Sequence, residues 1–182
     1  MKISSIPLSG VYIIDLPVFF DTRGRLVKTF SDVWFKKNNL CTNFKENFYS
    51  VSFKNTIRGM HFQLPPMDHA KFVYVPKGRI IDVILDLRKN SKTYGKFIDV
   101  EVSDKNNIAI YIDKGFAHGF KALENNTFVF YSTSKPHSKT HDCGIRWDSF
   151  GYDWKIKNPI MSEKDKNLID FERFRSPFKV RV

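Results

Sequence analysis

The chain has 182 residues, of which 42% are apolar and 27% charged, and its formal net charge is +11. This length predicts a single domain over residues 1–182 with a sizeable hydrophobic core. No apolar run approaches the ~20 residues that cross a bilayer, and the N-terminal residues lack the long apolar segment of a signal peptide.

The charge and the cysteines constrain the partners and the compartment. The excess of Lys and Arg suits nucleic acid, an anionic small substrate such as a nucleoside diphosphate, or simply a soluble basic surface. The basic residues are spread along the chain, and no basic block or nucleic-acid motif occurs, so we expect no nucleic-acid partner. Cys41 and Cys143 are far apart and match no metal-binding spacing, which favours a cytoplasmic protein with reduced thiols.

The predicted elements begin with a strand over 11–16, a charged turn over 19–25 and a strand over 27–30. A short helix over 33–37 follows, capped by Ser31 or Asp32. Between 44 and about 133 the pattern is typical of strands separated by turns, the clearest at 48–53, 71–75, 79–87, 97–102, 108–112 and 127–133. Many short strands without helices between them predict an all-β antiparallel sandwich or barrel.

Two further features complete the pattern. The strand at 79–87 is apolar apart from Asp82 and Asp86, so both carboxylates need buried partners. Residues 162–165 have the form of a capping box, which predicts a short helix near the C-terminus.

The stretch 58–66 and the residues just after it concentrate polar groups in apolar surroundings. Arg58 and His61 are three residues apart, so a regular strand would place them on opposite faces. They converge only if the backbone bends, which Gly59 permits. Converging polar groups in an apolar wall are typical of a small-molecule site; the alternative is a buried, satisfied histidine beside surface cations. The polar members of the set are Arg58, His61, Gln63 and Lys71.

A barrel mouth would bring His61 and Lys71 together with His118, Tyr131 and Asp165. A carboxylate orients a histidine as a general base, a tyrosine on the far side returns a proton, and a lysine holds an anion on oxygen. Such a set suits epimerisation next to a carbonyl. Each residue also has a simpler reading: Asp165 as a helix cap, Tyr131 as a core aromatic, Lys71 as a surface residue, and the glycines around His118 as turn residues.

A metal or a cysteine nucleophile is the rival use of this site. The chain has no His-x-His pair, and Met60 and Phe62 flank His61 where a further ligand would be needed. Neither cysteine lies in a recognisable nucleophile motif. We therefore expect neither a metal nor a cofactor.

Several motifs resemble the dTDP-4-dehydrorhamnose 3,5-epimerase family, in order, from about residue 11 to 165. The longest are Arg58-Gly59-Met60-His61-Phe62-Gln63 and Gly115-Phe116-Ala117-His118-Gly119-Phe120. Others are Pro65-Pro66, Ala70-Lys71, Asp82-Val83, Asp86-Leu87-Arg88, Ser91 with Thr93-Tyr94-Gly95, Gly144-Ile145-Arg146-Trp147-Asp148, and Pro159-Ile160-Met161-Ser162 with Asp165. The resemblance implies a cupin-like jelly-roll barrel, a homodimer with an exchanged N-terminal strand, and a nucleoside-diphosphate 4-keto-6-deoxy-hexose as substrate.

The resemblance also implies roles for individual residues. His61 is the base, Asp165 orients it, Tyr131 is the acid on the far face, and Lys71 stabilises the C4 enolate. Arg58 and His118 line the sugar pocket, and Arg23 reaches the diphosphate. The implied substrate-binding set is Arg23, Arg58, Gln63, His118, Phe20, Glu46 and Lys28.

The chain departs from the family pattern near the nucleotide and near the sugar. Lys28 stands where the family has Glu, and Glu46 and Phe48 stand where it has Gln and Asn. Residues 135–137 replace a further tyrosine after Tyr131 that is linked to whether one or both carbons react. The main interpretation is a dTDP-linked 3,5-epimerase. The alternatives are a mono-epimerase of CDP- or GDP-linked sugars, a non-catalytic β-barrel that binds sugar nucleotides or glycans, and a metal-dependent enzyme.

Overall fold

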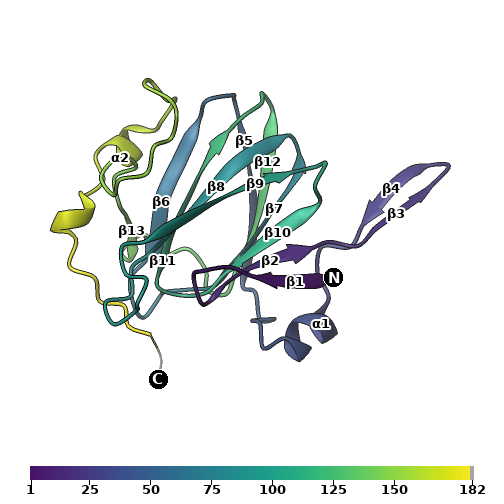
Figure 1. Ribbon diagram of the computed structural model, residues 1–182, viewed down its shortest axis with the longest axis horizontal. Helices are drawn as coiled ribbons and strands as arrows, with labels where there is room; N and C mark the ends of the chain where they lie inside the picture. Colours follow the sequence, from purple (N-terminus) through teal and green to yellow (C-terminus); the bar gives the residue numbers. More distant parts are fainter. Residues whose placement is uncertain (181–182) are drawn as a thin grey trace.

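The computed structural model of the chain describes residues 1–180 and consists mainly of two antiparallel sheets packed face to face (Figure 1). One sheet has the strand order β1-β2-β10-β7-β12-β5 and the other β13-β6-β11-β8-β9. The first sheet is built from β1 (Lys2–Ser5), β2 (Val11–Asp15), β5 (Glu46–Ser52), β7 (Lys71–Lys77), β10 (Ile108–Ile112) and β12 (Thr127–Thr133). The second is built from β6 (Ile57–Gln63), β8 (Arg79–Asp86), β9 (Phe97–Ser103), β11 (Phe116–Ala122) and β13 (Asp142–Gly144).

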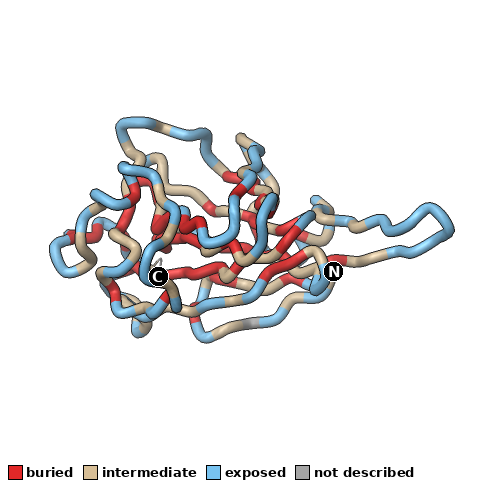
Figure 2. The backbone as a smooth tube through the Cα atoms, turned by 90° about the horizontal axis from the view of Figure 1, so that it is seen from above, coloured by how far each residue is buried: buried red, intermediate tan, exposed pale blue. Residues whose placement is uncertain are grey.

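The jelly-roll architecture confirms the predicted fold class, and most predicted strands lie within a few residues of their expected positions. The prediction of a strand over 27–30 is wrong. Residues 18–27 instead form a hairpin of β3 (Val18–Asp21) and β4 (Gly24–Val27), where a charged turn was expected. The turn closes because Asp21 Oδ1 accepts a hydrogen bond from the backbone N–H of Arg23 at 2.8 Å. The hairpin projects away from the barrel (Figures 1 and 2).

Apolar residues between the two sheets form the main core, with Ile84 and Phe120 from one sheet facing Val73 and Ile110 from the other. Figure 2 shows buried backbone along the strands and exposed backbone along the hairpin. The buried carboxylates of the apolar strand have partners, as predicted: Asp82 bonds to a histidine, and Asp86 accepts hydrogen bonds from a neighbouring arginine, serine and threonine.

Three short helical segments complete the described chain: α1 (Asp32–Lys37), α2 (Glu163–Lys166) and a 3₁₀ turn at Phe171–Arg173. Ser31 and Ser162 cap the two α-helices, since each hydroxyl accepts a hydrogen bond from a backbone N–H in the first turn. The short helix predicted from the motif at 162–165 is therefore present, with Ser162 as its N-cap. Within residues 1–180, no helix is long and apolar enough to cross a membrane.

The segment after β13 packs over the outer face of the second sheet (Figure 1). Its aromatic side chains join Phe62 in a second apolar cluster, in which Phe174 and Phe178 approach the Phe62 ring at 5.2 and 5.6 Å. This packing anchors the chain on both sides of α2, and α2 contacts β6. The fold thereby brings Asp165 of α2 to the middle of β6.

Candidate active site

A pocket of about 710 Å³ opens at one end of the barrel, with walls from both sheets and from α2. Of the predicted site residues, it is lined by His61, Asp165, Tyr131, Lys71, Arg58, Gln63, His118 and Glu46. These eight come from β5, β6, β7, β11, β12 and α2, so the fold gathers groups up to 119 positions apart in the chain, from Glu46 to Asp165. The expectation that they share one barrel mouth is met, while their chemical roles stay predictions.

A bulge in β6 brings Arg58 and His61 to the same pocket. In the pairing of β6 with β11, His61 lies opposite His118 and Arg58 opposite Phe120, so three steps on one strand match two on the other. Gly59 sits in the bulge with φ of +128°, and an added Cβ there would lie 2.5 Å from Gly119 Cα. Only glycine fits this conformation and this close approach. The bend predicted from the spacing of Arg58 and His61 is therefore present.

His61 and Asp165 form a tight pair at the pocket wall, with 2.7 Å between Nε2 and Oδ1. Because an ionised carboxylate only accepts hydrogen bonds, Nε2 carries the proton and Nδ1 keeps the lone pair of a base. The Asp165 side chain is 6% exposed and that of His61 34% exposed, so the carboxylate is covered while the ring reaches the pocket.

Asp165 is held in its ionised form by several donors. Its Oδ2 accepts from the Gly59 backbone N–H at 3.2 Å, so the bulge that reorients β6 also binds the carboxylate. Burial alone raises the pKa of this carboxyl, but the hydrogen bonds from His61, Gly59 and Ser162 keep the pKa below its ordinary value. Asp165 thus acts both in the α2 capping turn and as the partner of His61, the two uses weighed from the sequence.

Tyr131 lies on β12 in the opposite sheet and is 8% exposed. Its ring stacks on Phe48 with centroids 4.7 Å apart and 16° between planes, and the His118 ring approaches it at 6.2 Å in an edge-on arrangement. Burial raises the pKa of the phenol above its ordinary value. Tyr131 therefore keeps its proton at neutral pH and has one to give.

Lys71 is placed beside the base, because its Nζ donates to the backbone carbonyl oxygen of His61 at 3.0 Å. Burial lowers the pKa of Lys71 to about 8, although the negative charges of Asp82 and Asp142 oppose that shift. A partly desolvated ammonium group of this kind interacts strongly with an anion that forms nearby.

Two further cationic or polar groups are fixed in the wall. His118 and Asp82 are both buried, and His118 Nε2 lies 2.5 Å from Asp82 Oδ1. Arg58 is anchored by two residues of β5 in the other sheet, since Nε donates to Ser52 Oγ at 3.1 Å and Nη2 to the Val51 carbonyl oxygen at 3.2 Å. Rigid side chains of this kind shape a pocket without having to be ordered by the ligand.

Gln63 and Glu46 line the pocket but are engaged by the protein. The Gln63 amide nitrogen donates to the Met67 carbonyl oxygen at 2.9 Å, and its oxygen accepts from the Ser138 backbone N–H at 2.6 Å. Glu46 Oε2 accepts from the backbone N–H of His137 at 2.7 Å. In the structure both side chains tie the loops of the pocket rim together, a use the sequence did not indicate.

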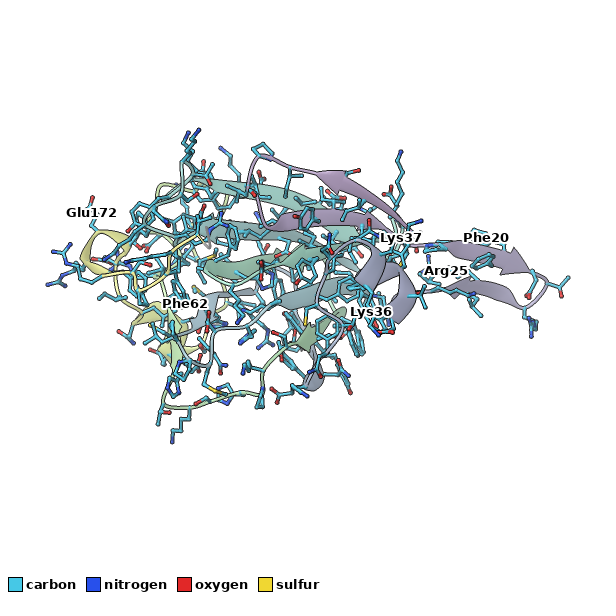
Figure 3. The ribbon with its side chains drawn as sticks, turned by 90° about the horizontal axis from the view of Figure 1, so that it is seen from below. Phe20, Arg25, Lys36, Lys37, Phe62 and Glu172 are labelled. Carbon is cyan, nitrogen blue, oxygen red and sulfur yellow. The ribbon has the colours of Figure 1, made fainter. Side chains whose placement is uncertain are left out.

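The structure does not bring Arg23, Phe20 and Lys28 to this pocket. Arg23 and Phe20 lie on the projecting hairpin and Lys28 directly follows it, and Figure 3 shows Phe20 on the arm beyond the barrel. Arg23 forms an ion pair with Asp21 at 2.5 Å, and Lys28 Nζ lies 5.5 Å from the centre of the Phe19 ring. Within one chain, the predicted diphosphate and nucleotide contacts are thus separated from the predicted catalytic residues.

Several lining residues were not predicted as site residues. Phe48, Ser50 and Ser52 alternate along β5 and face the pocket, a period of two that the sequence contains. Asp142 reaches the pocket from β13, where it pairs with Gln63 and accepts hydrogen bonds from Lys164 and His137. The sequence around β13 has no strand pattern, so the position of β13 beside β6 could not be predicted from it.

The pocket does not present a metal centre in the described part of the chain. Among residues 1–180, no group of three or more His, Cys, Asp or Glu side chains is arranged to hold a metal ion. The two histidines predicted as site residues are instead each matched with one carboxylate, His61 with Asp165 and His118 with Asp82. This arrangement suits proton transfer by side chains.

The family model described as dTDP-4-dehydrorhamnose 3,5-epimerase matches residues 5–173. The chain belongs to this family. The epimerase of that name from Methanothermobacter thermautotrophicus is 40% identical over 165 residues, covering 88% of this chain and 89% of the relative. The one from Sinorhizobium fredii is 36% identical, covering 92% of this chain and 88% of the relative.

A solved epimerase of this family, from Bacillus anthracis with TDP and pyrophosphate bound, superposes with a TM-score of 0.90. It is 31% identical and covers 93% of this chain and 98% of its own. The family resemblance inferred from the motifs and the jelly-roll fold that this resemblance implied are therefore both confirmed.

Proposed function

We propose that the protein is a metal-independent isomerase that inverts C3 and C5 of dTDP-4-dehydro-6-deoxyglucose and so forms dTDP-4-dehydrorhamnose. The observation that carries the proposal is that two opposite walls of one pocket hold complementary groups. The His61–Asp165 pair lies on β6 and α2, and Tyr131 lies on β12 of the other sheet. A base and an acid on opposite walls are what inversion of a carbon requires. Family membership and relatives that carry this enzyme's name support the same reaction.

The reaction begins with the proton on the carbon next to the C4 ketone. His61 Nδ1 takes that proton, and the electron pair of the broken C–H bond moves into the carbonyl, giving an enolate with its charge on the C4 oxygen. The imidazolium is stabilised by Asp165, and the ammonium of Lys71 stabilises the enolate oxygen. Tyr131 then donates its proton to the opposite face of the carbon, and the phenolate and imidazolium return to their resting states by exchange with water.

The same ketone activates both C3 and C5, so one set of groups serves two inversions. Arg58 and His118 bind the sugar hydroxyls and the nearer phosphate in this proposal, because both are rigidly held in the pocket wall. The pocket is large enough for a sugar with part of its nucleotide, and the basic excess of the chain attracts a diphosphate.

We further propose a homodimer in which the β3–β4 hairpin of one protomer reaches the pocket of its partner. The hairpin exposes three large apolar side chains, Phe19 at 53%, Phe20 at 76% and Leu26 at 56%. A two-stranded hairpin with this much apolar surface is marginal by itself and is stabilised by packing on a neighbour. Arg23 would then supply a diphosphate contact that each pocket lacks within its own chain.

The proposed compartment is the cytoplasm. Cys41 and Cys143 are both free and only partly exposed in the structure, which suits a reducing environment.

To test the proposed reaction, the purified protein is incubated with dTDP-4-keto-6-deoxyglucose and the sugar products are followed by NMR. Wild-type protein should form the C3,C5-inverted product, and His61→Ala should abolish it while keeping the folded near-ultraviolet spectrum. His141→Ala is the matched control, because His141 hydrogen bonds to Ser138 outside the pocket, and it should retain turnover.

The same assay with CDP- and GDP-linked keto-sugars tests the nucleotide, and failure with all three substrates would refute the epimerase proposal. Sedimentation analysis tests the dimer: a fully active monomer would contradict the exchanged hairpin.

A further inference from the structure

Phe48 lies directly against the proposed acid. The register of β5 and β12 pairs Phe48 with Tyr131, and the two rings stack almost in parallel. Phe48 is 45% exposed and lines the pocket, whereas Tyr131 is buried beneath it. One face of the Phe48 ring thus covers the phenol while the rest of the side chain borders the space for the substrate.

The Tyr131 ring is held by aromatic packing. Phe48 covers one face, and the edge-on His118 ring, itself fixed by Asp82, approaches from another side. β5 is the edge strand of its sheet, so in the described part of this chain no further strand supports Phe48 from beyond it. The Tyr131 ring is thus held between His118 and Phe48, with the Ser50 hydroxyl near its phenol group, and Phe48 is the contact that covers the ring face.

We propose that Phe48 is a positioning residue that holds Tyr131 in line for protonation of the far face of the sugar carbon. The inference rests on the proposed function and adds to it the residue that determines how often proton removal ends in inversion. Phe48 acts through Tyr131 and takes no part in the proton transfers.

The chemistry supplies a sensitive readout, because the enolate has two possible fates. If Tyr131 is aligned, the proton arrives on the opposite face and the carbon is inverted. If it is not, the imidazolium of His61 exchanges its proton for a deuteron from D2O and returns that deuteron to the original face, which leaves deuterium without inversion. The ratio of inversion to exchange therefore reports the alignment of Tyr131, and a general loss of folded enzyme does not change it.

The experiment measures this ratio at C3 and C5 by NMR for Phe48→Leu in D2O. Leucine keeps apolar volume on the strand but removes the flat ring, and misalignment of the acid should lower the ratio roughly tenfold. Phe48→Tyr keeps the ring and should restore the wild-type ratio. Tyr49→Leu is the matched control, since Tyr49 is a neighbouring exposed aromatic on the same strand that does not line the pocket.

Binding of dTDP to the same variants, measured by calorimetry, separates positioning from nucleotide contact. The proposal expects Phe48→Leu to keep its dTDP affinity within about twofold while the ratio falls. An unchanged ratio, with or without weaker dTDP binding, would overturn it, as would equal loss of exchange and inversion. Absence of any exchange in wild-type protein would instead refute the proposed function.

Discussion

Replacing Asp165 by Asn tests the pair on which the site depends. The carboxylate lies 2.7 Å from His61 Nε2 and its side chain is 6% exposed, so its charge acts on the imidazolium with little screening by water. A hydrogen bond to a charged group contributes about 1.5–3 kcal/mol. If Asp165 gives this stabilisation to the imidazolium in the transition state, Asp165→Asn lowers kcat about 10- to 150-fold.

Asparagine nearly preserves the shape of the side chain. Its single oxygen can accept a hydrogen bond from His61 or from Gly59, but its NH2 group cannot accept the other one, because it only donates. The assay is the initial rate of deuterium exchange at the sugar carbons as a function of pH. The rate should be lower than that of wild-type protein across the profile, because the imidazolium that forms on proton removal loses its carboxylate partner.

Glu163→Gln is the matched control, since Glu163 is an exposed carboxylate of the same helix paired only with Lys166 among the described residues. It should leave both rate and profile unchanged. A wild-type rate in folded Asp165→Asn would refute the assignment of Asp165 as the orienting partner and leave it as a helix cap.

Three more predictions follow from the site. Tyr131→Phe should lose inverted product far more than exchange of the carbon-bound proton, and equal loss of both by NMR would count against the acid role. The rate should fall as pH rises through about 8, where Lys71 loses its charge. The pKa of the unfolded lysine is near 10.5, so the unfolded state binds more protons than the folded state between pH 8 and 10.5. The free energy of unfolding, measured by urea titration, should therefore rise over this pH range by up to about 3 kcal/mol from this group. Gly59→Ala places a Cβ 2.5 Å from Gly119 Cα and should cost about 3 kcal/mol, or roughly 6–12 °C in melting temperature; an unchanged melting temperature would contradict the bulge.

The strand framework was predictable because hydrophobic alternation and turn residues are local signals. β9 alternates exposed with less exposed residues, and the first part of β12 alternates buried with half-buried residues, which is the period of two that marks a strand. The bend at Gly59 was also predictable, since the spacing of Arg58 and His61 makes sense only if the strand is irregular. For the strands and for this bend, the residues that determine the backbone conformation are close together in the sequence.

The features that escaped prediction depend on contacts between distant segments. The β3–β4 hairpin exposes its large apolar residues, so it lacks the half-buried pattern that marks a strand. β13 has only three residues and exists because β6 offers it an edge to pair with. The internal use of Gln63 likewise depends on Met67 and Ser138, which only the folded loops bring within reach.

The catalytic set was predicted through a combination of chemistry and motif. Taken singly, His61, Tyr131 and Asp165 each had an ordinary structural role, and Asp165 does take part in the helix cap, since its backbone N–H donates to Ser162 Oγ. The structure shows that the capping turn and the bulge at Gly59 together hold the carboxylate against His61. A structural role and a chemical role therefore coincide in one residue.

The most direct test of the account is incubation of wild-type protein with dTDP-4-keto-6-deoxyglucose in D2O, followed by NMR at C3 and C5. We expect deuterium at both carbons together with inversion at both, because one ketone activates both positions and His61 and Tyr131 face the pocket from opposite sheets. Label at one carbon only would restrict the enzyme to a single inversion. Absence of label at both carbons, with this substrate and with its CDP- and GDP-linked counterparts, would contradict the central claim.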